Sequence, residues 1–396
     1  IQMSLIDTWA ATGAGAFSLS ENALYTVDAW KIFLDRLTDD GIFTVSRWYS
    51  PEDLGETGRV ASLAVAALQE SGVTDPARHL AMLTTGRVAT TLVASEPFRD
   101  EDIARLHALA NDFGYDLVIS PDAPPENGIL QAIVSAHTPE ELHLAVAEAP
   151  FNYDPPTDEN PYFFNMLRLT RLPDAFRSAP GIASGNLAAT FTLLVLTCCL
   201  AALAVTTVVV PLAIKRRQQS RSGTTTRTSW AGVVYFSLIG AGFMLFEIAL
   251  VQRLSVFLGH PVYALGILLF TLIASAGIGS LLSERLAVTA RMRSYPLAVL
   301  MAAVILGVRF AVPWGSSQLV AASMTVKIAF TVTALFPLGM LLGLFFPMGM
   351  RLARLSGTED TPWYWSLNGV FGVLSSALAV LVSIYLGISV TLYLAA

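Results

Sequence analysis

An acidic residue at the end of a short apolar segment is the first feature of the sequence that could do chemistry. The segment IQMSLI, residues 1–6, is followed directly by Asp7. A carboxylate within hydrogen-bonding reach of an amine can act as a general base. Ligands of open α/β sheets bind beyond the carboxyl ends of the strands, so Asp7 stands where a catalytic acid would be placed. The alternative is that its side chain only caps the following turn.

The loop that follows Asp7 is expected to form the rim of the same pocket. Our candidate substrate-binding residues come from this stretch and are Thr8, Trp9, Glu21 and Tyr25. Outside it, four histidines are scattered without metal-ligand spacing, so the sequence predicts no metal site. These histidines are His79, His107, His137 and His143.

Alternating apolar and amphipathic segments predict the elements that must position these residues. Helical periodicity predicts a helix from Asn22 to Leu37, with Ser20 as its cap. Further helices are predicted at 58–69 and 101–113, and strands at 42–45, 87–94 and 115–120. Such alternation is typical of a mostly parallel sheet with helices on its faces.

Charge and hydropathy divide the chain near residue 180. Hydrophobic residues make up 54% of it and charged residues 14%, which is typical of a membrane protein. Residues 1–180 hold 11 Lys and Arg against 26 Asp and Glu, a net of −15, whereas residues 181–396 hold 13 against 4, a net of +9. We therefore expect a soluble domain at 1–180 and a transmembrane domain at 187–396. The acidic first part argues against a nucleic-acid partner.

Six apolar runs predict membrane-spanning helices, with the lipid bilayer as their partner. Most are long enough to cross a hydrocarbon core of about 30 Å. A further run from Ile388 would be a seventh, and recurring small residues favour a packed bundle. The runs are Leu187–Ile214, Trp230–Val251, Val262–Leu282, Pro296–Val312, Leu319–Met350 and Trp363–Leu386.

A few charged residues interrupt these runs. Glu247, Arg309 and Lys327 fall in one half of the membrane when the spans alternate, with Arg253 and His260 in the adjoining loop. One hypothesis is a polar cavity in which Glu247 pairs with Lys327 or Arg309 and receives a cationic or polar substrate. The alternative is that the two cations reach the interface while Glu247 bonds a neighbouring helix.

A proline-rich segment with three aromatic residues stands before the membrane part. Asp158 and Glu159 lie there beside Tyr162, Phe163 and Phe164. The segment either closes over a pocket or packs as an aromatic plug between the domain and its neighbour.

Two sequence stretches and the membrane runs together resemble the membrane-fused spermidine synthase-like proteins. The stretches are SLIDTWAATGAGAFSLSENALYTVDAW at Ser4–Trp30 and PPTDENPYFFN at Pro155–Asn165. The resemblance implies a partial Rossmann-like α/β domain of the S-adenosylmethionine methyltransferase type, followed by a polytopic α-helical transmembrane bundle. It also implies that residues 1–6 form the fourth strand and that the glycine-rich cofactor loop lies upstream of Ile1. The sequence is therefore expected to be a fragment.

The same resemblance implies an activity. The donor would be S-adenosylmethionine or its decarboxylated form, and the reaction an aminopropyl or methyl transfer to a small-molecule amine or a lipid-proximal acceptor. Soluble aminopropyltransferases carry Asp-x-x-Asp after this strand; Asp7 matches the first acid, but Ala10 replaces the second. Two alternatives follow: a non-catalytic scaffold with a degenerate domain, or a transporter that uses Glu247.

The side of the membrane on which the soluble domain lies is left open by the sequence. The basic loops are on the side opposite the soluble domain, so the positive-inside rule places that domain outside the cytoplasm. A domain that uses S-adenosylmethionine should instead face the cytoplasm. We expect a multi-pass protein of the plasma (inner) membrane in either case.

Overall fold

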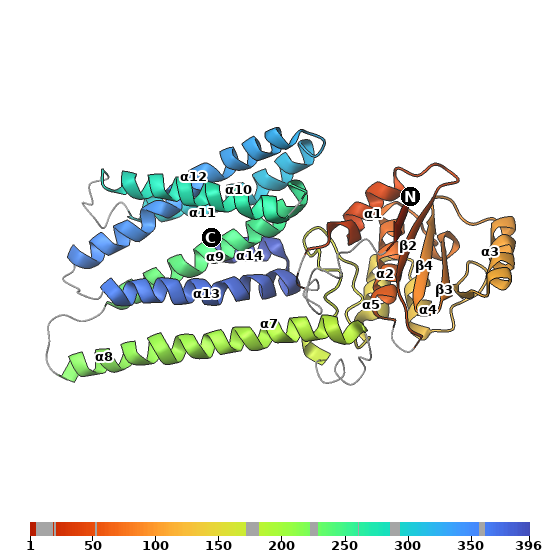
Figure 1. The fold of residues 1–396 in the computed structure, drawn as a ribbon, viewed down its shortest axis with the longest axis horizontal. Helices are drawn as coiled ribbons and strands as arrows, with labels where there is room; N and C mark the ends of the chain where they lie inside the picture. The colour runs from red at the N-terminus through yellow and green to blue at the C-terminus, as the bar shows by residue number, and fades with distance from the viewer. Residues whose placement is uncertain are drawn as a thin grey trace. The chain divides into compact units, whose positions relative to one another are not determined.

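The computed structural model describes residues 1–4, 19, 21–51, 54–171, 182–221, 229–259, 261–285, 294–355 and 361–396 (Figure 1). The chain divides into two compact units, Ile1–Thr192 and Leu193–Ala396. This division falls within helix α7 (Ile182–Ala204), beyond the position near residue 180 that charge and hydropathy indicate. Asp7, Thr8, Trp9, Ser20 and His260 lie outside the described residues.

The first unit contains a five-stranded mixed sheet in the order β1-β2-β4-β3-β5. β1 and β2 are parallel, and the other three neighbouring pairs are antiparallel. β1, β2 and β3 therefore run in one direction, and β4 and β5 in the other. The strands are β1 (Gln2–Ser4), β2 (Ile42–Trp48), β3 (Leu80–Thr85), β4 (Val88–Ala94) and β5 (Asp116–Ile119).

The prediction of a mostly parallel sheet is wrong, because a tight hairpin lies where the sequence analysis saw one strand. Only Gly86 and Arg87 separate β3 from β4, and two such strands pair antiparallel. Gly86 has a φ of 54°, which a glycine adopts at no steric cost. The strand before this turn, β3, was not predicted.

One face of the sheet is buried throughout, and helices α1 (Val27–Leu34) and α2 (Gly55–Glu70) lie over it. Phe43, Val45 and Arg47 point to this side, each at most 3% exposed, and Phe43 contacts the ring of Trp30 on α1. The other face is covered by α3 (Asp100–Phe113) only in part, over a small apolar cluster (Figure 1). Elsewhere it carries the partly exposed hydroxyls of Ser46 and Thr90, hydrogen-bonded at 2.9 Å.

Helix α1 begins later than predicted. Residues Ala23–Tyr25 form a 3-10 turn, and Thr26 then caps the helix by accepting the backbone N–H of Ala29 at 3.2 Å. A threonine at this position satisfies one of the helix's free N–H groups and fixes where the helix starts. The predicted helices at 58–69 and 101–113 are confirmed as α2 and α3. Two short helices follow, α4 (Gly128–Val134) and α5 (Pro139–Ala147).

Within the described part of the chain, six helices are long and apolar enough to cross a membrane, which confirms the six predicted runs. The chain is a multi-pass membrane protein. α7 continues through a π turn (Val205–Val209) into α8 (Val210–Arg221) as one span. The last described helix, α14 (Ile388–Ala395), rises about 12 Å over its eight residues. The other spans are α9 (Trp230–Phe257), α10 (Pro261–Ser283), α11 (Ser294–Gln318), α12 (Met324–Leu355) and α13 (Thr361–Leu386).

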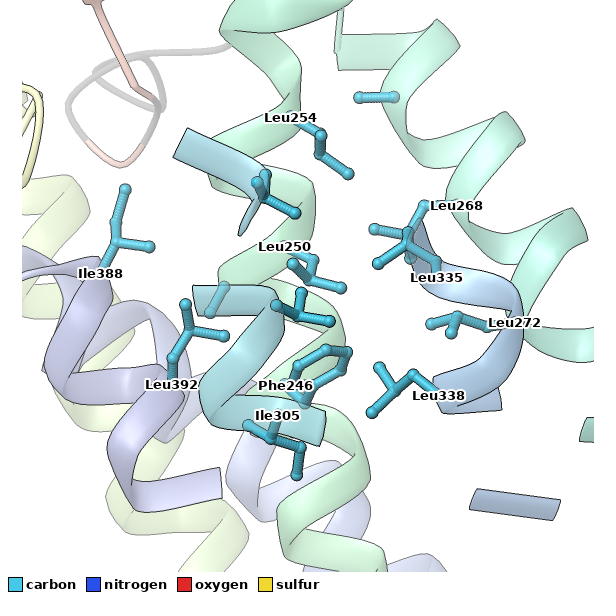
Figure 2. Close-up of a cluster of buried hydrophobic side chains, with 14 of the residues drawn as sticks. Phe246, Leu250, Leu254, Leu268, Leu272, Ile305, Leu335, Leu338, Ile388 and Leu392 are labelled. Atoms are coloured by element: carbon cyan, nitrogen blue, oxygen red, sulfur yellow. The ribbon is translucent and has the colours of Figure 1, made fainter. Parts of the chain in front are cut away.

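The second unit is a packed bundle rather than a set of separate anchors. Its main core joins α9, α10, α11, α12 and α14, as Figure 2 shows for Phe246, Leu268, Ile305, Leu338 and Leu392. Glycines bring two pairs of helices into backbone contact. A Cβ atom at Gly279 of α10 would overlap the carbonyl oxygen of Met340 on α12, and one at Gly240 of α9 would overlap that of Asn368 on α13.

Candidate functional site

The sequence predicts a site around Asp7, after the strand that the structure shows as β1, whose carboxyl end lies beside that of β2. Because these strands are parallel, with Ser4 opposite Ser46, both end at the same edge of the sheet. β2 passes there into α2, and the hydroxyl of Thr57 donates to the carbonyl oxygen of Trp48 at 2.8 Å. Asp7 follows Ser4 by three positions. Asp7, Thr8 and Trp9 are themselves outside the part of the chain that the structure describes.

A buried arginine stands next to this edge, on the covered face of the sheet. Arg47 is 3% exposed, and its guanidinium carbon lies 4.3 Å from the centre of the Tyr25 ring. The guanidinium also donates to the Tyr25 hydroxyl and forms a salt bridge of 3.7 Å with Glu56, at the start of α2. A carboxylate and an aromatic face both compensate the cation for lost hydration. Arg47 thus links β2 to α2 through Glu56 and to the segment before α1 through Tyr25.

Tyr25 belongs to this packing. Its ring is 1% exposed and stacks on Phe163 at 4.5 Å. In the structure Tyr25 contacts Arg47 and Phe163, and its direct contact with a substrate stays a prediction. Glu21, four positions earlier, is partly exposed. The next residue, Asn22, donates its backbone N–H to the carbonyl oxygen of Pro161 at 2.7 Å.

The aromatic segment packs into the first unit's own core. Tyr162, Phe163 and Phe164 are each at most 1% exposed, so the three rings are packed rather than standing open to solvent. Polar contacts fix it to the start of α1. The Asp158 carboxylate accepts from the Thr26 hydroxyl at 2.8 Å, and its backbone N–H donates to Asp28 at 2.9 Å.

A second buried arginine holds this segment from α2. The Arg59 guanidinium donates to the carbonyl oxygens of Asp154, Tyr162, Phe163 and Asn165 at 2.5–3.0 Å. Burial lowers the pKa of Arg59 to about 9, against the opposing effect of the Asp154 carboxylate, so the side chain is still charged at neutral pH. The sequence analysis missed Arg59. The available signal was that it is the only charged residue between Glu56 and Glu70 on a helix of small and apolar residues.

The histidines make ordinary structural contacts. His107 meets Asp122 and His143 meets Asp154, each at 3.0 Å. The side chain of His79 contacts a backbone carbonyl. Within the described ranges, no group of three His, Cys, Asp or Glu side chains could hold a metal ion.

The charged residues of the membrane unit do not form the expected pair. Among the residues that the structure describes, no salt bridge joins Glu247 to Arg309 or Lys327. Arg309 lies 5.1 Å from the Tyr393 ring and Lys327 lies 5.4 Å from the Phe257 ring. Depth separates Glu247 from Lys327. α9 runs to Phe257, so Glu247 is about 15 Å from its end, whereas Lys327 is in the first turn of α12.

Glu247 is nonetheless buried, at 8% exposure, and its role in a transporter stays a hypothesis. Arg253, near the end of α9, donates to the hydroxyl of Ser389 on α14 at 3.0 Å. This contact links the short C-terminal helix to the bundle. His260 falls outside the described residues.

The fold and these contacts define a multi-pass membrane protein with a mixed α/β unit. No protein-family model, curated protein or solved structure matches the chain.

Proposed function

We propose that the chain is part of a membrane-bound transferase that moves an aminopropyl or methyl group from an S-adenosylmethionine-type donor to an amine or lipid-proximal acceptor. The direction of the strands carries the proposal. β4 runs antiparallel between β2 and β3, which share one direction with β1. The parallel pairing of β1 with β2 supports β1 as the fourth strand that the resemblance to spermidine synthase-like proteins implies.

The charge of the first unit suits both reactants. The donor carries a sulfonium and a protonated amine acceptor is also a cation, and residues 1–180 have a net charge of −15. The donor supplies an activated carbon on sulfur. In this chain Asp7 takes the proton from the acceptor amine while the new N–C bond forms and the C–S bond breaks. Glu21, one of the predicted substrate-binding residues, offers a carboxylate that could hold a cationic acceptor.

Calorimetry of the full-length protein in lipid nanodiscs tests the proposal. We expect one of the two donors, S-adenosylmethionine or its decarboxylated form, to bind. Asp7→Asn should keep donor binding and lower transfer to a test diamine or amine lipid by about 100-fold or more, the usual contribution of a general base. Asp112→Asn, at an exposed position of α3, is the control and should change neither donor binding nor the rate of transfer. Absence of binding by both donors contradicts the proposal.

A non-catalytic scaffold is the second candidate, and Arg47 favours it. The charged groups next to the edge, Arg47 and Glu56, are 3% exposed and bind each other rather than facing a pocket. Ala10, in place of a second acid, agrees with this candidate. For a scaffold, neither donor binds and no transfer is detected, so Asp7→Asn changes nothing that is measured.

A further inference from the structure

A cavity of about 620 Å³ lies within the membrane unit, between α9, α10, α12 and α13. Its walls are largely apolar, and Phe243, Phe346 and Trp365 are the aromatic side chains that line it. A few polar groups, Ser280, Asn368 and Ser376, interrupt the apolar surface. This volume and this lining are typical of sites that bind small, mostly apolar ligands.

The cavity exists because two closely packed pairs of helices face each other without filling the space between them. Gly240 fixes α9 against α13, and Gly343 fixes α12 against α10, where a Cβ would overlap the carbonyl oxygen of Ala276. Gly277 and Gly369 also line the cavity, but a Cβ at either position would meet nothing within 4 Å. Larger side chains would therefore fit at these two positions, and the glycines keep the space open.

The cavity opens toward lipid. Trp365 and Val373 line it and are 60% and 55% exposed, both on the membrane-spanning helix α13. The exposed face of a spanning helix meets hydrocarbon chains, and apolar cavities do not hold stable water. The occupant that can enter from this side is a lipid chain.

Basic side chains gather at the end of the bundle nearest this cavity. α10 and α12 end there, since the Arg351 guanidinium donates to the carbonyl oxygen of Ser283 at 2.5 Å. Arg351 stands one turn, about 6 Å along α12, beyond the cavity residue Pro347. Lys215 is at this end too, 5.7 Å from the Trp363 ring at the start of α13. The charges at this end suit a lipid phosphate.

We propose that the cavity binds one acyl chain of an anionic phospholipid whose phosphate contacts Arg351. The site is independent of the transferase proposal, because it uses only residues of the membrane unit and requires no donor. Gly277 and Gly369 leave room for the acyl chain, and the positive charge of Arg351 favours an anionic headgroup.

Native mass spectrometry of the full chain released from nanodiscs tests this site. The nanodiscs contain equal amounts of phosphatidylglycerol and phosphatidylcholine. We expect the unmodified protein to retain phosphatidylglycerol over phosphatidylcholine by at least fivefold. Equal retention of the two lipids by the unmodified protein would overturn the proposal, and this measurement needs no variant.

Cavity-filling variants then locate the binding. Gly369→Leu and Gly277→Leu, on different helices, should each lower lipid retention at least tenfold. Gly266→Leu is the matched control, since Gly266 also faces open space but does not line the cavity, and it should retain lipid normally. Arg351→Gln should remove the preference for phosphatidylglycerol, while Arg354→Gln at an exposed position of α12 should not. Unchanged retention in both leucine variants refutes the site.

Discussion

Arg59 on α2 donates a hydrogen bond to the carbonyl oxygen of Asn165 at 2.5 Å, across 106 positions of the chain. Three more carbonyls of the same segment converge on this guanidinium. One side chain thus supplies hydrogen-bond donors to the backbone carbonyls of a buried segment, most of which is neither helix nor strand.

We expect Arg59→Met to destabilise the first unit by about 3 kcal/mol or more. The methionine occupies similar space but leaves four carbonyl oxygens without this donor, and each unsatisfied buried group costs about 1–3 kcal/mol. Cleavage of the 152–165 segment by chymotrypsin, across a urea series on the full chain, measures the loss. The control Arg105→Met, at an exposed position of α3, should change the free energy of unfolding by no more than about 0.5 kcal/mol. A similar loss in both variants would show that the hydrogen bonds of Arg59 do not stabilise the unit.

The Arg47–Glu56 pair should show strong coupling. Glu56→Gln removes the carboxylate 3.7 Å from a buried guanidinium, and we expect it to cost about 3–5 kcal/mol. Replacing both residues, as Arg47→Met with Glu56→Leu, should recover most of this loss because no charge then stays buried. A double-mutant cycle on the full chain measures the coupling. Additive losses would mean that the two side chains act separately.

Contact between α10 and α12 depends on Gly279 and Gly343. Gly343→Ala should lower the stability of the membrane unit by about 1–3 kcal/mol, since the added methyl overlaps the carbonyl oxygen of Ala276 and pushes the helices apart. Gly266→Ala, where a methyl meets nothing, is the control on α10. Thermal unfolding in detergent, followed by tryptophan fluorescence, compares them. Equal stability would contradict the close approach of these helices.

Glu247→Gln should leave the bundle as stable as before, or more stable. The glutamine keeps the shape of the side chain, breaks no ion pair with Arg309 or Lys327, and removes the cost of a charge inside the membrane. Thermal stability in detergent and uptake of cationic substrates into vesicles are measured separately. Loss of uptake with unchanged stability would favour the transporter, whereas marked unfolding would show that the carboxylate is a structural lock.

The membrane helices could be predicted from the sequence because a bilayer demands about twenty apolar residues in each span. The five-stranded sheet could not, because a two-residue turn at Gly86 and Arg87 decides the direction of β4. Thr26 likewise shortened a helix whose periodicity extends back to Asn22. A single turn thus decided the direction of β4, and a single capping residue decided the start of α1, against what the longer sequence pattern predicted.

The packing near the Asp7 edge was also beyond sequence reasoning, for another reason. Arg47 is bound by Tyr25, Glu56 and Phe164, which come from three separate parts of the chain. An arginine within a strand pattern predicts an exposed position, and only the assembled core shows why it is buried. Asp7, which lies outside the described residues, stays a prediction from its place after an apolar strand.

The length of α12 makes the protein sensitive to bilayer thickness. Its 32 residues rise about 48 Å, against about 30 Å of hydrocarbon. A helix of this length must tilt or extend beyond the hydrocarbon, and its close contact with α10 makes the two helices tilt together. Hydrophobic mismatch would therefore act on the pair as one body, and membranes with longer acyl chains should hold it more upright.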